Sequence, residues 1–78
     1  MLYPLTDRQK LVLGEVHNFI KSHNYPPTIP EIQNSLLIRN PGAVCKCFKA
    51  LEKKGYIVRK KGQHRGLDLT PEAKEFLQ

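Results

Sequence analysis

Basic side chains gather in one part of this 78-residue chain, and the chemistry open to them is the binding of a polyanion. Residues 39–66 carry nine lysines and arginines against one acidic residue, Glu52, and the net charge of the whole chain is +6. Residues 1–38 are balanced in charge, and residues 67–78 are acidic. A surface that is charged only for solubility mixes its signs. The concentration of positive charge in one segment therefore predicts a nucleic-acid site.

Within this segment, a run of small and basic residues is suited to a DNA groove. Lys46 can reach a guanine edge or a phosphate, and Ala43 or Cys45 can pack on a thymine methyl group. Gly42 permits close approach, and Asn40 can contact a phosphate as well as cap a helix. The alternative is an ordinary solvated helix face. The candidates for DNA binding in this segment are Arg39, Asn40, Gly42, Ala43, Cys45, Lys46, Lys49 and Lys53, and Thr28, which precedes the segment, is a further candidate.

A second group of candidates surrounds the glycine-bracketed segment 62–66. Its cations favour contact with phosphates or with the minor groove of DNA. The alternative is an ordinary exposed turn. The candidates in this group are Lys60, Lys61, Gln63, His64 and Arg65.

The first group must be positioned by a helix, which the pattern predicts over about residues 41–54. Asn40 suits the N-cap, Pro41 suits the first helical position, and Gly55 suits the left-handed residue that ends a helix. Apolar residues at i, i+3, i+4 and i+7 predict one buried stripe. The stripe comprises Val44, Cys47, Phe48 and Leu51.

Two further helices are predicted before it, over about residues 7–23 and 29–36. Each begins with a capping box, in which a threonine is followed three residues later by glutamine or glutamate. Pro26 and Pro27 prevent a helix between them, and residues 37–39 form a short turn. The capping boxes are Thr6 with Gln9 and Thr28 with Glu31. The expected core residues are Val12, Leu13, Val16, Phe19 and Ile20, then Ile29, Ile32 and Leu36.

After Gly55 the hydrophobic period changes from 3.6 to 2, which predicts strands over residues 56–61 and 67–69. A short last helix is expected from about residue 70 to Leu77, with Ala73, Phe76 and Leu77 available to pack. The predicted fold is mainly α with a small β-hairpin. It is a winged helix-turn-helix with three helices, the wing and a short C-terminal helix. The length predicts a single domain over residues 1–78.

The sequence offers no pattern for catalysis or metal binding. It contains no nucleophile–base pair, no paired carboxylates in an apolar setting and no phosphate-binding glycine loop. His17, His23 and His64 are scattered. Cys45 and Cys47 point roughly 200° apart on a helix, so they cannot share a disulfide or a metal. We expect no enzyme activity, metal, cofactor or small-molecule ligand, with Cys47 packed and Cys45 at the surface.

Membrane and export signals are also missing from the sequence. No apolar run approaches the ~20 residues that span a bilayer. Residues 1–4 lack the basic and apolar regions of a signal peptide. We therefore expect a cytoplasmic protein that contacts no membrane.

Five blocks of the sequence resemble the N-terminal domain of LexA-type repressors in order and spacing. The resemblance covers residues 5–69, and the Pro-Pro-Thr and Lys-Ala-Leu blocks are fairly specific together. It implies a winged helix-turn-helix that reads the major groove with the helix at 41–54 and touches the DNA backbone with the wing. The blocks are Leu5–Gln9, Pro26–Ile32, Arg39–Pro41, Lys49–Ile57 and Arg65–Leu67.

The chain departs from the family pattern in three ways. Leu37 stands where the family usually has a small residue, often glycine. Gly42, Cys45 and Lys46 stand where better-known members carry polar or acidic residues, so the operator should differ. LexA repressors also continue into a Ser/Lys self-cleavage domain that dimerises them, whereas this sequence stops at Gln78. Autoproteolysis and a response to DNA damage are therefore not expected of it.

Two functions remain open at this point. The first is a sequence-specific, double-stranded DNA-binding transcriptional regulator, with repression as its expected action. The alternative is a winged-helix module for protein–protein interaction, such as a small phage or host inhibitor. The charge distribution favours the first, because a protein-docking face is less uniformly cationic. We also expect a weak homodimer through residues 70–78, or a monomer that pairs only on DNA.

Overall fold

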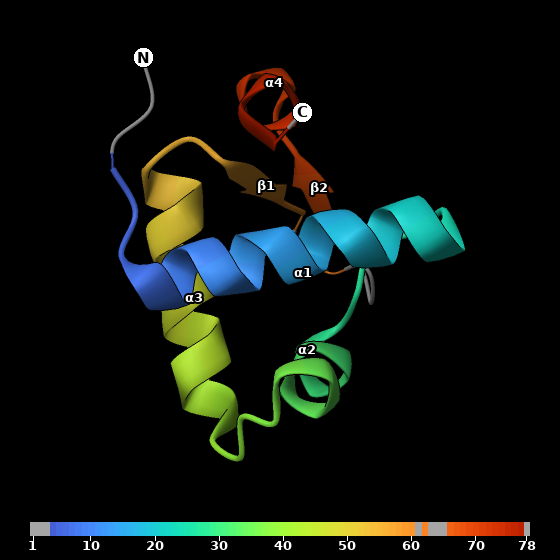
Figure 1. Ribbon diagram of the computed structural model, residues 1–78, viewed down its shortest axis with the longest axis vertical. Coiled ribbons are helices and arrows are strands. Elements are labelled where there is room, and N and C mark those ends of the chain that lie inside the picture. Colours follow the sequence, from blue (N-terminus) through green and yellow to red (C-terminus); the bar gives the residue numbers. More distant parts are fainter. Residues whose placement is uncertain (1–3, 61, 63–65, 78) are drawn as a thin grey trace.

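Capping residues determine where the helices begin. The computed structural model describes residues 4–60, 62 and 66–77 of the chain. These form α1 (Asp7–His23), α2 (Ile29–Leu36), α3 (Pro41–Lys53), β1 (Ile57–Arg59), β2 (Leu67–Leu69) and α4 (Pro71–Leu77). In Figure 1, α1 lies across α3, with α2 on one side of α1 and the hairpin and α4 on the other. This is the winged helix-turn-helix that the sequence predicted.

Both predicted capping boxes are present. The backbone N–H of Gln9 donates to Thr6 Oγ1 at 3.2 Å, and the N–H of Thr6 donates to Gln9 Oε1 at 3.2 Å. The N–H of Glu31 donates to Thr28 Oγ1 at 3.4 Å, and the N–H of Thr28 donates to Glu31 Oε1 at 2.8 Å. Each box satisfies backbone donors that a helix start would leave free. Gly55 follows α3 with a φ of 88°, the left-handed conformation expected of it.

The core lies where α1, α2, α3 and the hairpin meet. All four residues of the predicted α3 stripe are buried, and so are three of the five core residues predicted on α1. Ile20, Ile29 and Leu36 are partly buried and pack against the edge of this core. The buried residues of this hydrophobic cluster are Val12, Leu13, Val16, Ile32, Val44, Cys47, Phe48, Leu51, Tyr56, Ile57, Leu67, Leu69 and Ala73.

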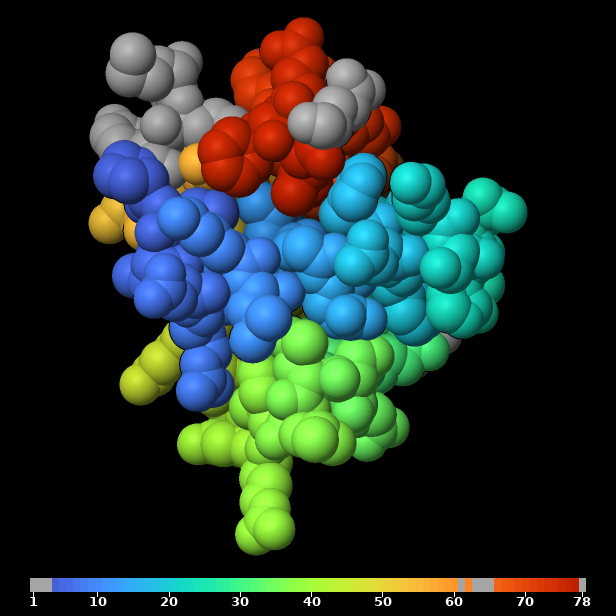
Figure 2. Space-filling view, viewed as in Figure 1, coloured from blue at the N-terminus to red at the C-terminus, as the bar shows by residue number. Residues whose placement is uncertain are grey.

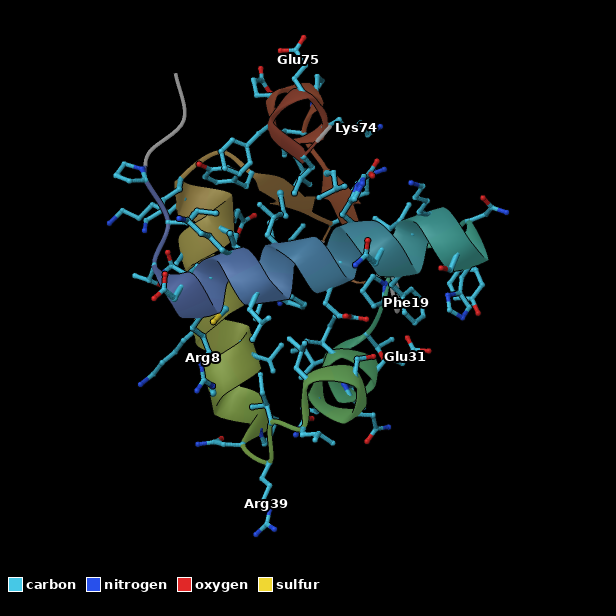
Figure 3. The ribbon with its side chains drawn as sticks, in the orientation of Figure 1. Arg8, Phe19, Glu31, Arg39, Lys74 and Glu75 are labelled. Carbon is cyan, nitrogen blue, oxygen red and sulfur yellow. The ribbon has the colours of Figure 1, made fainter. Side chains whose placement is uncertain are left out.

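Phe19 departs from the predicted core face of α1. Its ring stacks on His23 with the centroids 4.1 Å apart, and it meets Tyr25 edge-on at 5.6 Å. Figure 3 shows Phe19 near the C-terminal end of α1. The prediction that Phe19 packs in the core was wrong, because near this end of the helix the side chain finds aromatic neighbours instead of the buried cluster.

The hairpin pairs Ile57 with Leu69 and Arg59 with Leu67 in antiparallel register. Alternation along β1 buries Ile57 and exposes Val58, as a half-buried strand requires. The ladder is shorter than the predicted strand over residues 56–61. Tyr56 precedes the ladder as a buried core residue, and position 61 lies outside the described residues.

Thr70 joins the base of the hairpin to α4. Its hydroxyl donates to the carbonyl oxygen of Gly55 at 2.7 Å and accepts from the N–H of Ala73 at 3.1 Å. Ala73 is buried, whereas Phe76 is 54% exposed and meets Tyr56 edge-on at 5.5 Å. None of the helices within the described residues is long and apolar enough to cross a bilayer.

Candidate nucleic-acid interface

The turn between α2 and α3 presents the start of α3 at one end of the molecule. The backbone passes through Leu37 at φ 56° and ψ 41°, a left-handed conformation that disfavours a branched side chain. The Leu37 side chain is 88% exposed. Arg39 projects from the body of the protein beyond this turn (Figure 3). In the space-filling view, this end of the molecule forms a narrow projection (Figure 2). The short turn predicted at residues 37–39 is therefore present, with leucine in a conformation that glycine adopts freely.

Asn40 acts as the N-cap of α3. Its Oδ1 accepts from the backbone N–H of Gly42 at 2.8 Å, and the N–H of Ala43 donates to the Asn40 carbonyl oxygen at 3.1 Å. A Cβ at position 42 would stand 3.1 Å from Asn40 Oδ1. Glycine at position 42 therefore leaves room for the capping side chain of Asn40. Because Asn40 and Gly42 are both exposed, it also lets a ligand approach the backbone closely from outside.

The outer face of α3 is basic. Lys46, Lys49 and Lys53 are all exposed, as the helical phase predicted. Ala43 is half-buried, and Cys45 is half-buried too, so the expectation of a surface thiol was only partly right. Cys45 lies one position from the buried stripe, and the packing of α3 covers part of its side chain.

Cys47 lies on the buried side of α3, as predicted. Burial raises the pKa of its thiol, and the nearby positive charge of Arg8 opposes that change. Arg8 projects from α1 beside α3 in Figure 3. Cys47 is consequently a packed side chain whose thiol stays protonated and uncharged near neutral pH.

Arg59 on β1 is a candidate that the sequence analysis missed. Its guanidinium carbon lies 5.8 Å from the centroid of the Phe48 ring, in a cation–π arrangement. The signal was available, because Arg59 stands two residues after the buried Ile57 and so shares its face of the strand.

Arg59 lines an open groove of about 560 Å³ between the start of α2, α3 and the hairpin. Thr28, Lys60 and Glu52 also line it, so two cations and one carboxylate of the described residues face this groove. The Thr28 hydroxyl accepts from the backbone N–H of Glu31 and donates to its carboxylate at 3.1 Å. Thr28 thus serves first to cap α2, at the edge of the groove.

One cation of the basic segment is committed to the scaffold. Lys54 Nζ donates to Gln9 Oε1 at 2.7 Å and to the carbonyl oxygen of Pro4 at 3.0 Å. It ties the end of α3 to the start of α1, whereas Lys60 is exposed at the end of β1. The remaining wing candidates lie outside the described residues, and these are Lys61, Gln63, His64 and Arg65.

Comparison with known proteins identifies the family of this chain. The family model described as the LexA DNA binding domain matches residues 2–66. LexA repressor from Anaeromyxobacter dehalogenans (strain 2CP-1 / ATCC BAA-258) is 47% identical over 73 residues, which are 94% of this chain and 32% of that protein. LexA repressors from Geotalea uraniireducens and Thermotoga maritima are 45% and 44% identical over 66 residues each, 85% of this chain and 33% of each relative.

The chain therefore spans about a third of the length of these curated relatives. The family model covers the helix-turn-helix and β1 and ends just before β2, so it includes the elements that present the basic residues. The identities extend over nearly the whole chain and exceed those of chance resemblance by a wide margin. This chain belongs to the LexA DNA-binding domain family.

Proposed function

We propose that this chain is the operator-reading part of a transcriptional repressor. The observation that carries the proposal is the placement of exposed lysines along α3 beside a hairpin that supplies Arg59 and Lys60, in a chain of a DNA-binding family. In this mode α3 enters the major groove of double-stranded DNA and the hairpin follows the adjacent backbone. Residues 1–78 act together as one binding unit, without a catalytic residue, metal or cofactor.

The α3 residues divide into readers and anchors in this proposal. Lys46 reaches a base edge, while Ala43 and Cys45 approach thymine methyl groups. Arg39 and Asn40, at the start of α3, lie against a phosphate. Lys49 and Lys53 face the backbone farther along the helix, where their charge steers and strengthens binding without reading sequence.

The wing completes the proposal. Arg59 and Lys60 meet phosphates beside the groove at the start of α2, where Thr28 holds the helix end in place. The sequence pattern alone supports adding four further wing residues to this phosphate contact, and these are Lys61, Gln63, His64 and Arg65. The family of the chain does not favour the alternative of a module for protein–protein interaction.

A salt series tests the proposal. Binding to a random-sequence duplex and to a duplex selected from a random pool is measured from low to physiological salt. If five or six cations meet phosphates, log K falls against log[salt] with a slope of roughly −5. A slope shallower than about −2 would remove the cationic face as the binding surface.

We further propose that the chain pairs weakly, either through residues 70–78 or only on DNA that carries a repeated site. Phe76 on α4 is 54% exposed, although its ring contacts Tyr56 on one side. Two recognition helices then read half-sites about 34–36 Å apart. Sedimentation of the free protein and of its complex measures this, and a monomer that binds a single half-site at nanomolar concentration would refute both forms.

A further inference from the structure

Gln33 on α2 bonds to three successive residues of the turn that leads into α3. Its side-chain Nε2 donates to the carbonyl oxygens of Ile38 at 3.3 Å and Arg39 at 2.9 Å. Its own backbone carbonyl accepts from the N–H of Leu37 and from the N–H of Ile38, the latter at 2.9 Å. Since a glutamine amide has two hydrogens, both of its donors are used within the turn.

The turn is one that needs such a restraint. Leu37 occupies the left-handed region, which a leucine enters only at a cost in conformational energy. Its side chain is 88% exposed, so packing of that side chain does little to hold the conformation. The hydrogen bonds of Gln33 close the turn in the conformation that the leucine disfavours.

The direction of α3 depends on this turn. Arg39 is the last residue before the N-cap Asn40, and its carbonyl oxygen is one of the two atoms held by the Gln33 side chain. A rotation at Leu37 would move Arg39, Asn40 and the first turn of α3 together. A small misplacement of this kind changes contacts to base edges, whose geometry is strict, more than contacts to phosphates.

We propose that Gln33 is a positioning residue for DNA reading, which holds the α2–α3 turn closed and so fixes the start of α3 against the major groove. This inference rests on the proposed function. Because both amide hydrogens are engaged with the turn, Gln33 acts through α3 and not by donating to a base. The pairing of Gln33 with a left-handed Leu37 is a property of this sequence, in which glutamine compensates for the missing glycine.

The test compares Gln33→Met with Asn34→Met. Methionine keeps the length and the helix propensity of glutamine but has no donor. Asn34 is exposed on the same helix and, among the described residues, makes no hydrogen bond to the turn, so its replacement controls for the new side chain. Affinity is measured for the duplex that wild-type protein selects from a random pool and for a random-sequence duplex at the same salt concentration. NMR order parameters of residues 38–42 and thermal unfolding are measured on the free proteins.

Gln33→Met should bind the selected duplex about tenfold more weakly, in keeping with the loss of one well-placed base contact, and the random duplex within about twofold of wild type. Its order parameters at residues 38–42 should fall, while Asn34→Met should match wild type in both affinities and in these order parameters. Adding Leu37→Gly to Gln33→Met should regain most of the lost affinity, because glycine adopts the left-handed conformation freely.

Three results would overturn the proposal. These are an unchanged affinity of Gln33→Met for the selected duplex, an equal loss on both duplexes together with a lower melting temperature, and a failure of the double variant to regain affinity. If wild-type protein selects no duplex, the proposed function fails by itself. The order parameters then still decide whether Gln33 holds the turn.

Discussion

Leu37→Gly should stabilise the protein, although it removes a large apolar side chain. A leucine in the left-handed region costs about 1–2 kcal/mol, which glycine does not incur. Glycine lowers stability by about 0.4–1 kcal/mol, because it makes the unfolded chain more flexible. The Leu37 side chain is 88% exposed, so almost no burial is lost. The net gain should be about 0.5–1 kcal/mol, which for a chain of this length is a rise in melting temperature of roughly 2–8 °C.

Thermal and urea unfolding followed by circular dichroism measure this effect, with Asn24→Gly as the matched control. Asn24 ends α1 in the same left-handed conformation, at φ 63°, but asparagine tolerates that region well. Asn24→Gly should therefore leave stability unchanged or lower it slightly. A lower melting temperature for Leu37→Gly, or an equal gain for both variants, would refute the reasoning that leucine strains the turn.

The other predictions concern α3 and its two thiols. Lys46→Ala should alter sequence preference and lower the binding free energy for the best site by about 1–3 kcal/mol, whereas Lys60→Ala should weaken binding to all sequences about equally. Competition with a random DNA pool distinguishes the two variants, and an unchanged sequence preference of Lys46→Ala would exclude α3 as the reading element. A thiol reagent should label Cys45 in the native protein and Cys47 only after unfolding, with bound DNA protecting Cys45; rapid native labelling of Cys47 would contradict the helical phase. Because burial raises the pKa of Cys47, the unfolded chain loses this proton first, so stability should fall as the pH rises above 9.0, and less steeply in Cys47→Ala.

The elements of this fold could be read from local sequence because their ends are encoded locally. Thr6, Thr28 and Asn40 are caps whose partners lie two or three residues away, and Gly55 adopts its left-handed conformation from its own chemistry. The buried stripe of α3 follows from helical periodicity alone. Such features need no knowledge of which elements meet in space.

The parts that local sequence did not predict depend on contacts between elements. Lys54 binds Gln9 across 45 positions, so its charge could not be separated from those of the exposed lysines beforehand. Arg59 gains its place from the Phe48 ring on another element. Phe19 packs outside the predicted core because its aromatic neighbours lie around the end of α1. Periodicity gives the face of a helix but not what that face meets.

The cation–π contact of Arg59 with Phe48 has a consequence for the thermodynamics of association. An exposed lysine such as Lys46 is free to rotate before binding, and immobilising such a side chain costs about 0.5–1.5 kcal/mol. Arg59 is already restrained by the aromatic ring, so less entropy remains for it to lose. A positive charge on α3 and one at Arg59 therefore differ in how much side-chain entropy they lose on binding. In the proposed complex, the preorganised guanidinium contributes more free energy per phosphate contact than the mobile lysines do.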